Sequence, residues 1–387
     1  MQRGHTGRYE VSTVSGEPVR AFVPLDLPPI PPLEWSGARH RLFERANLAL
    51  GRLDSISTLL PDPHLFLYSY VRREAVLSSQ IEGTQSSLSD LLLFELEGGP
   101  GAPFDDVVEV SNYVAALNHG LDRLREGFPL SNRLIREMHE RLLVDTRGSR
   151  KQPGEFRRSQ NWIGGTRPGN AAFVPPPPAE VEPLLAALER FIHADEPQLP
   201  ALARAALAHV QFETIHPFLD GNGRVGRLLI VLMLHADGLL RDPLLYLSLF
   251  FKQHRAEYYR LLDAVRTDGD WEAWLDFFLE GVDVTARGAV DTAQQLLQLM
   301  HADGQRIQIG GRSALAAQQV FTVLCERPII SLKEVCRRRG VSFPTASKGT
   351  RTLVQLDIAR EITGKRRNRV FTYDQYLAIL SEGTEPL

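Results

Sequence analysis

Twelve consecutive residues near the middle of the chain combine the side chains that phosphate chemistry needs. They read His216-Pro-Phe-Leu-Asp220-Gly221-Asn222-Gly223-Arg224-Val-Gly-Arg227. Gly221 and Gly223 permit backbone conformations that other residues resist, so with Asn222 they can turn successive N–H groups toward one anion. Arg224 and Arg227 lie three apart, on one face of a helix whose N-terminal dipole also favours an anion. The stretch predicts a site for more than one phosphate.

Two further residues of this stretch indicate what is done with the phosphates. Asp220 would repel phosphate unless a divalent cation lay between them, so it favours a magnesium nucleotide over a bare anion. His216 can take up a proton near neutral pH and is the candidate general base. A lone His before Pro-Phe more often packs in a loop, and one Gly-x-Gly is weak evidence. The combination within twelve residues is what favours chemistry.

The complete stretch resembles the Fic-domain signature, His-x-Phe-x-Asp/Glu-Gly-Asn-Gly-Arg-x-x-Arg, and departs from it at no defined position. The resemblance implies a protein adenylyltransferase that moves AMP from ATP to a Ser, Thr or Tyr hydroxyl of a target protein or of itself. His216 would be catalytic, and Asp220 would hold Mg²⁺. The implied ATP-binding residues are Gly221, Asn222, Gly223, Arg224 and Arg227, with Tyr258 and Tyr259 near the adenine. The two tyrosines could instead simply pack.

A helix predicted at residues 65–82 carries a second motif. Ser78 and Glu82 are four apart, hence on one helix face, and Gly83 follows as a helix cap. Alone, this is a common solvated helix end. Beside the signature, it resembles the inhibitory Ser/Thr-x-x-x-Glu-Gly/Asn motif of the Fic family. A carboxylate delivered to Arg227 would form a bidentate pair and occupy the guanidinium that a terminal phosphate needs.

The segment at residues 154–174 predicts a β-hairpin, because two short strand-like pieces are separated by Gly, Pro and Asn. The resemblance makes it the flap that holds a target segment by strand addition, with Trp162, Ile163 and Gly164 near the active site. An unpaired strand edge can accept almost any extended peptide through main-chain hydrogen bonds. A purely structural hairpin is the competing interpretation.

Helices must position these residues. Apolar periodicity predicts buried helices at residues 201–215 and 225–234, on either side of the signature loop, and scaffold helices at 39–60, 107–126 and 131–144. Residues 1–34 are polar and then proline-rich, which predicts an extended arm. We therefore expect a mostly α fold: an N-terminal region at 1–115, a Fic core at 116–295 and a further domain at 300–387.

The last segment differs in charge from the rest. Residues 305–387 hold 14 Lys and Arg against 7 Asp and Glu, although the whole chain has a net charge of −3. Helices at 314–325, 331–339 and 345–356, then strands at 358–363 and 369–373, predict a winged helix-turn-helix. Its DNA-facing residues would be Thr345, Ser347, Lys348, Thr350, Arg351, Lys365, Arg366, Arg367 and Arg369. The alternatives are DNA binding, which calls for a homodimer or other help, and protein docking.

Composition sets the remaining limits. With 387 residues, 43% of them hydrophobic and 24% charged, the chain predicts an ordinary soluble protein of two or three domains, with no membrane partner. Cys325 and Cys336 form neither a metal-ligand spacing nor a disulfide framework, which fits the cytoplasm. Two functional alternatives stay open. One is removal of AMP from a modified protein, with Glu82 positioning a water, and the other is a transcription regulator whose Fic core senses nucleotide.

Overall fold

A computed structural model describes residues 2–14, 16–59, 63–97, 104–195, 199–309 and 311–385 of the chain. The chain forms two compact units, each built from two stretches of sequence: Met1–Gly51 with Ser111–Ala286, and Arg52–Val110 with Arg287–Leu387. The boundaries fall inside the helices α1 (Gly37–Leu59), α4 (Phe104–Arg125) and α11 (Trp271–Gln308). Each unit combines two separate stretches of the chain, so the units do not test the domain bounds expected along the sequence. Those bounds stay a prediction.

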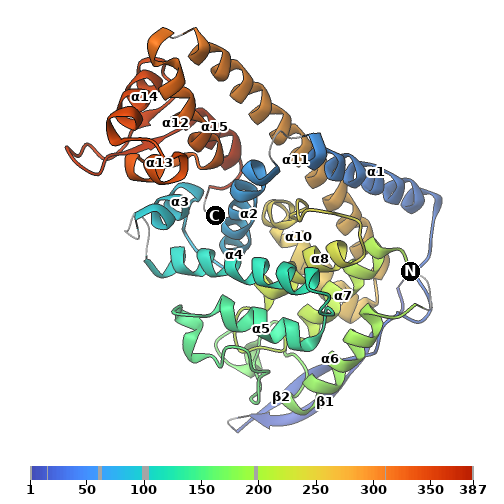
Figure 1. Cartoon of the computed structure of the whole chain (residues 1–387). Coiled ribbons are helices and arrows are strands. Elements are labelled where there is room, and N and C mark those ends of the chain that lie inside the picture. Colours follow the sequence, from blue (N-terminus) through green and yellow to red (C-terminus); the bar gives the residue numbers. More distant parts are fainter. Residues whose placement is uncertain are drawn as a thin grey trace. The chain divides into compact units, whose positions relative to one another are not determined.

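Helices make up most of the first unit, which confirms the expected fold class. Besides its parts of α1, α4 and α11 it contains α5 (Asn132–Leu142), α6 (Pro178–Ile192), α7 (Ala201–Ile215), α8 (Asn222–Ala236), α9 (Ser248–Gln253) and α10 (Arg255–Asp268), with 3₁₀ turns at Arg147–Arg150 and Pro168–Asn170 (Figure 1).

The helices α7 and α8 pack against each other at the centre of this unit. Both are buried nearly all round: on α7 every residue from Ala205 to Ile215 is buried, and on α8 every residue from Arg224 to Leu234. Such a pattern is typical of core helices. From α11, the indole N–H of Trp274 donates to the carbonyl of Ala206 at 2.9 Å. The loop that joins α7 to α8 is therefore held at both ends.

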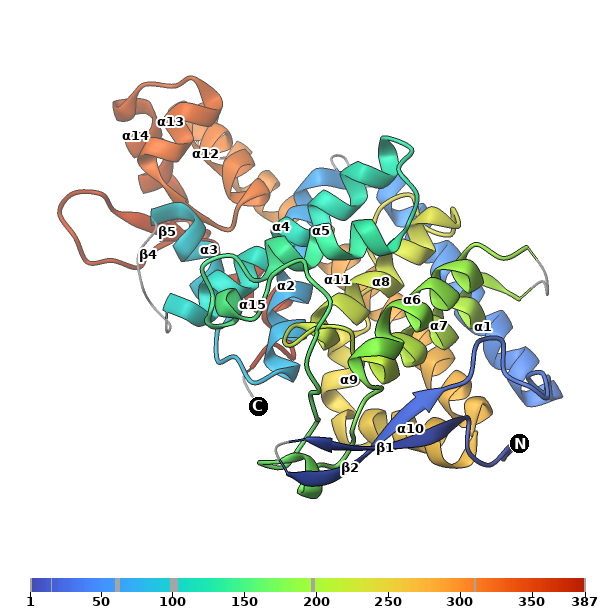
Figure 2. The same ribbon diagram turned by 90° about the horizontal axis from the view of Figure 1, so that it is seen from below.

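The N-terminal arm contains a hairpin that the sequence did not predict. Strands β1 (Gly7–Val14) and β2 (Glu17–Pro24) pair antiparallel along their whole length (Figure 2). The proline-rich residues 25–36 that follow are not helical, as expected. The hairpin ends against another part of the unit, because the N–H of Phe22 donates to the carbonyl of Val174 at 2.9 Å. β2 thereby borders the segment predicted as the flap.

The second unit joins helices from two distant parts of the chain. Its further elements are α2 (Pro63–Ile81), α3 (Leu88–Glu97), the 3₁₀ turn Gly311–Ser313, α12 (Ala314–Glu326), β3 (Ile329–Ser331), α13 (Leu332–Arg339), α14 (Phe343–Gln355), β4 (Arg360–Glu361), β5 (Val370–Thr372) and α15 (Asp374–Ser381). The strands form an antiparallel sheet in the order β3-β5-β4. We call residues 311–385 the C-terminal module.

The three helices and two strands predicted in the C-terminal module are confirmed, with β4 and β5 shorter than expected. Strand β3 and helix α15 were not predicted. Thr350 does not face solvent, which corrects one expectation: it is buried, and its hydroxyl donates to the carbonyl of Ala346 at 2.9 Å. A Thr in a helix interior often bonds back to the preceding turn in this way. Among the described helices, none is long and apolar enough to cross a membrane.

Candidate functional site

The signature loop starts and ends at residues with a left-handed backbone. His216, the C-terminal cap of α7, has φ 49° and ψ 62°, and Gly221, the N-terminal cap of α8, has φ 78°. For Gly221 this conformation is ordinary, but for a residue with a Cβ atom it costs about 1–2 kcal/mol. Strained backbone of this kind persists only where the surroundings over-determine it, and it clusters at functional sites.

Asn222 holds the loop through its side chain. Its Oδ1 accepts a hydrogen bond from the N–H of Phe218 at 2.8 Å, and its Nδ2 donates to the carbonyl of Phe218 at 2.9 Å. Both residues are buried. The amide side chain therefore pairs with Phe218 as a neighbouring strand would. Because the side chain is used in this way, only the main-chain N–H group of Asn222 can take the role toward phosphate that the sequence predicts.

Arg157 holds the start of the loop through hydrogen bonds. The sequence did not predict this role. Its guanidinium donates to four main-chain carbonyls: His216 at 2.9 Å, Pro176 at 2.6 Å, and Ile215 and Ser159 at 3.3 Å each. The residue is only 2% exposed, and burial lowers the pKa of the guanidinium to about 10. Its own N–H donates to the carbonyl of Pro217 at 2.9 Å. No sequence signal distinguishes it from the adjacent Arg158.

A buried histidine supports the other end of the loop. His139 stacks on Phe218 with ring centroids 3.7 Å apart. The N–H of Gly154 donates to its Nδ1 at 2.9 Å, so the ring proton lies on Nε2, which donates to the carbonyl of Asp220 at 3.0 Å. Burial lowers the pKa of His139 to about 4, which keeps the ring neutral at physiological pH. The direction of the Asp220 carbonyl is thus fixed.

The cationic residues of the site lie along the first turns of α8. Arg224 and Arg227 are both buried. Arg224 Nη2 lies 3.3 Å from Asp220 Oδ1, which also accepts the N–H of Gly221 at 2.6 Å. A helix N-terminus with two buried guanidinium groups is a strong anion site, because burial reduces the screening by water.

The site fits a magnesium ion only as part of a nucleotide complex. The Asp220 side chain is 41% exposed, so its carboxylate is accessible. Among the described residues, no group of three or more His, Cys, Asp and Glu side chains could hold a metal by itself. Mg²⁺ commonly binds through one or two carboxylates together with substrate phosphates and waters. One carboxylate beside an anion site meets that description.

Comparison with known proteins decides the family. Residues 40–122 match the model of the Fic/DOC family N-terminal region, and residues 129–234 match that of the Fic/DOC family. The chain belongs to the Fic/DOC family. It is 29% identical over 212 residues to the protein adenylyltransferase Fic of Drosophila grimshawi, a match that covers 53% of this chain and 40% of the fly protein. The chain thus spans less than half the length of such relatives.

Solved structures share this Fic fold. A Fic family protein from Desulfovibrio desulfuricans G20 superposes with a TM-score of 0.57 at 21% identity, over 88% of this chain and 97% of that one. Residues 134–508 of Fic-1 from C. elegans superpose with a TM-score of 0.52 at 23% identity, over 68% and 73% of the two chains. At these identities the similarity establishes the fold.

The hairpin of the Fic core lies where the sequence predicted it, as one antiparallel pair. The N–H of Ile163 donates to the carbonyl of Phe173 at 2.8 Å, and the N–H of Phe173 donates back at 3.1 Å. Trp162 is 38% exposed, and Gly164 is exposed with φ 68°. The role of these three residues in binding a target stays a prediction.

The two tyrosines occupy different environments. Tyr258 is buried, and its hydroxyl lies 2.9 Å from Nε2 of His209. Nδ1 of His209 lies 3.0 Å from the carbonyl of Gly226, so it carries the ring proton, and Tyr258 donates to Nε2. Burial lowers the pKa of His209 to about 3. Tyr258 therefore packs against α7, the helix before the signature loop, whereas Tyr259 is 41% exposed. Their contact with adenine stays a prediction.

The inhibitory motif belongs to the second unit of this Fic protein. Ser78 is buried on α2, and Glu82 is exposed just beyond its end. The N–H of Glu82 donates to the carbonyl of Ser79, and that of Gly83 to the carbonyl of Gln80, both at 3.0 Å. Gly83 has φ 102°, as expected for a glycine that ends a helix. The pairing of Glu82 with Arg227 stays a prediction.

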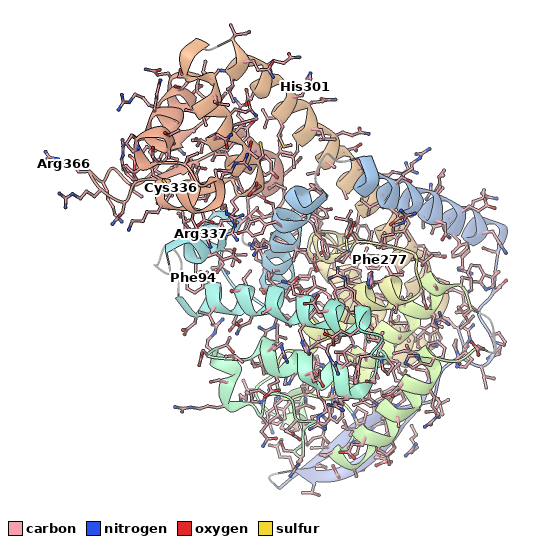
Figure 3. The ribbon with its side chains drawn as sticks, in the orientation of Figure 1. Phe94, Phe277, His301, Cys336, Arg337 and Arg366 are labelled. Carbon is pink, nitrogen blue, oxygen red and sulfur yellow. The ribbon has the colours of Figure 1, made fainter. Side chains whose placement is uncertain are left out.

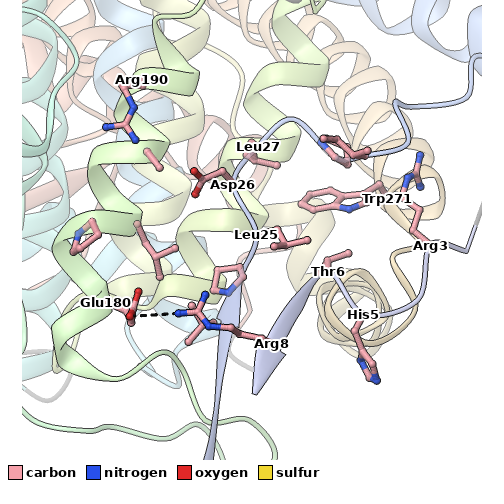
Figure 4. Close-up of a pocket in the computed structure, with 17 residues that line it drawn as sticks. Arg3, His5, Thr6, Arg8, Leu25, Asp26, Leu27, Glu180, Arg190 and Trp271 are labelled. Atoms are coloured by element: carbon pink, nitrogen blue, oxygen red, sulfur yellow. Dashed lines mark hydrogen bonds and ion pairs between the residues drawn. The ribbon is translucent and has the colours of Figure 1, made fainter. Parts of the chain in front are cut away.

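A separate cavity of about 580 Å³ lies beside the N-terminal arm of the first unit (Figure 4). Its walls include Leu25, Asp26, Arg190 and Trp271, and an ion pair between Arg8 and Glu180 crosses one side. None of the predicted site residues lines it. The cavity is therefore distinct from the site at the signature loop.

Replacing Arg157 by Lys should destabilise the first unit, since one ammonium cannot reach all four diverging carbonyls. Leaving two buried carbonyls unpaired should cost about 2–4 kcal/mol. Thermal unfolding of Arg157→Lys and Arg158→Lys would measure the effect, with the exposed Arg158 as the matched control. Equal unfolding temperatures of the two variants would contradict the role given to Arg157.

Proposed function

We propose that this chain transfers AMP from ATP to a hydroxyl group of a Ser, Thr or Tyr side chain, on a target protein or on itself. The observation that carries the proposal is the signature loop, in which a strained His216 and an arginine-rich helix N-terminus lie a few residues apart. The name of the fly relatives, protein adenylyltransferase, supports the same reaction class.

In the proposed reaction, the target hydroxyl attacks the α-phosphorus of ATP and gives its proton to His216. A new P–O bond forms to the target oxygen, the bond between the α-phosphorus and the bridging oxygen breaks, and pyrophosphate leaves. The N–H groups at the start of α8 and the guanidinium groups of Arg224 and Arg227 hold the phosphates and stabilise the charge of the leaving group. Mg²⁺ bound at Asp220 would neutralise further phosphate charge.

Replacing His216 by Ala should abolish transfer while nucleotide binding survives, because the base acts on the incoming hydroxyl. Loss of a general base should slow transfer by roughly 10²- to 10⁴-fold. Labelling from ATP carrying ³²P at the α-phosphate measures transfer, and calorimetry measures ATP binding. The exposed His301 gives the control variant His301→Ala (Figure 3). If His216→Ala labels as fast as the control, His216 is not the base.

Glu82 restrains this activity in our proposal. Arg227 lies one turn further along α8 than the glycine residues of the loop, where the outer phosphate of ATP would end. A carboxylate paired with Arg227 competes with that phosphate and repels it, so ATP would be held with its α-phosphorus out of line for attack. Glu82 lies just beyond the end of α2 and is exposed.

Glu82→Gly should therefore raise labelling from α-³²P ATP, and adding Arg227→Ala should remove most of the gain. Glu126→Gly, which changes another exposed glutamate just after a helix, is the control. No increase in Glu82→Gly would rule out the restraint. An increase that survives the loss of Arg227 would rule out the proposed pair.

Hydrolytic removal of AMP from a modified protein uses the same groups and is the alternative: a water oxygen bonds to the phosphorus, the bond from phosphorus to the side-chain oxygen breaks, and AMP leaves. Glu82 could position a water that attacks an AMP-modified side chain, with the released hydroxyl taking its proton from His216. Release of label from a modified protein by the wild type, and its absence in Glu82→Gly, would favour this alternative.

A second partner is proposed for the C-terminal module, namely the phosphate backbone of DNA. A cavity of about 680 Å³ there is lined by Lys333, Lys365, Arg366, Arg367 and Arg369, with Phe343 at its edge. The five cationic side chains are exposed, and Arg366 lies on the long loop between β4 and β5 (Figures 2 and 3). The order of helices and strands supports a winged helix, in which this loop is the wing.

Changing Lys348, Arg351, Lys365 and Arg367 together to Ala should weaken DNA binding and flatten its salt dependence. The logarithmic slope should fall by up to about 0.9 for each DNA phosphate that the variant no longer neutralises. Electrophoretic shift at several salt concentrations would test it. Arg337→Ala with Arg338→Ala is the control, because both arginines pair with Glu334. Salt-independent binding, or none by the wild type at low salt, would favour protein docking.

A further inference from the structure

The helix that carries the inhibitory motif is tied to the C-terminal module within the second unit. α2 packs against α12 and α15. The amide Nε2 of Gln80 donates to the carbonyl of Thr384 at 2.8 Å, and Nη2 of Arg73 donates to the carbonyl of Glu382 at 2.7 Å. Gln80, Arg73 and Thr384 are all buried. Residues far apart in the sequence thus meet on α2, next to the turn that bears Glu82.

Gln80 also closes that turn. The same Nε2 group donates to the carbonyl of Ser86 at 2.9 Å, while the main-chain carbonyl of Gln80 accepts the N–H of Gly83 at 3.0 Å. One residue therefore bonds both ends of the segment 83–86 and joins it to residue 384. A second tie comes from Asp106, whose Oδ2 accepts the N–H of Gln85 at 2.8 Å.

One side-chain bond lies within the turn itself, because Nε2 of Gln85 donates to the carbonyl of Gly83 at 3.4 Å. Within the described part of the chain, the hydroxyl groups of Ser79, Thr84 and Ser86 are buried and make no hydrogen bond to another group. Gly83 has open space where a Cβ would lie, so packing does not fix its backbone. The bonds made by Gln80 and Asp106 tie the turn to more distant parts of the second unit.

We propose that Gln80 is a positioning residue for Glu82, through which the C-terminal module sets how strongly the inhibitory carboxylate acts. The proposal rests on the restraint by Glu82 argued above. Because the bond to Thr384 joins the turn to the module, loss of this bond lets the segment 82–86 move and weakens the restraint. The C-terminal module then controls the activity of the Fic core whatever partner the module itself binds.

The test replaces Gln80 by Met in the full chain, which keeps the length of the side chain and removes both donors. Labelling from α-³²P ATP should rise about fivefold, which corresponds to one net hydrogen bond of about 1 kcal/mol. In a Glu82→Gly background the same change should have no effect, since the carboxylate that Gln80 positions is gone. The control Gln85→Met removes only the bond from Nε2 to the carbonyl of Gly83 within the same turn, leaves the tie between Gln80 and Thr384 intact, and should leave labelling unchanged.

Amide hydrogen exchange gives a second readout that does not depend on activity. The N–H groups of residues 82–86 should exchange faster in Gln80→Met than in the wild type or in Gln85→Met. Unchanged exchange overturns the proposal. So does a Gln80→Met variant that labels like the wild type while Glu82→Gly labels faster, or one whose gain persists without Glu82. No gain in Glu82→Gly itself would overturn the restraint, and with it the role of Gln80.

Discussion

The guanidinium of Arg157 is the group on which the signature loop depends. It donates to the carbonyls of Ile215 and His216, where the loop leaves α7, and to that of Pro176, which precedes α6. Hydrogen bonds from a charged donor are about twice as strong as neutral ones. Burial strengthens them further, so they fix the directions of the carbonyls that accept them. They hold His216 in a left-handed conformation that the residue would otherwise leave. The geometry of the signature loop thus depends on a residue outside the signature.

The other buried polar groups around the loop act in the same way. Asn222 pairs with both main-chain groups of Phe218, and His139 fixes the carbonyl of Asp220 as a neutral ring. Each of these side chains satisfies a backbone group that would be costly to bury alone. The loop can therefore lie in the interior without regular secondary structure. The loop leads directly into the start of α8, where Arg224 and Arg227 lie.

The two units divide the chain differently from the sequence order. Helices α2 and α3, which precede the Fic core in the sequence, share a unit with the C-terminal module (Figure 1). The motif at Ser78 and Glu82, for which we propose an inhibitory role, consequently lies in the unit that also carries the exposed cationic loop. Binding and folding equilibria are linked. A partner that binds this unit and changes its stability would therefore also change the contacts that hold the turn after α2.

The sequence by itself determined the signature, the helices on both sides of it and most elements of the C-terminal module, because each depends on local spacing: Gly221 and Arg224 near a helix start, or apolar residues at helical period. It did not predict the β1–β2 hairpin, whose strands pair with each other and border Val174, nor Arg157 and His139, which act on residues far along the chain. Only tertiary structure decided that Tyr258 bonds to His209 and that Gln80 meets Thr384. These are pairings between distant residues, and a local pattern carries no information about which distant carbonyl a buried donor will reach.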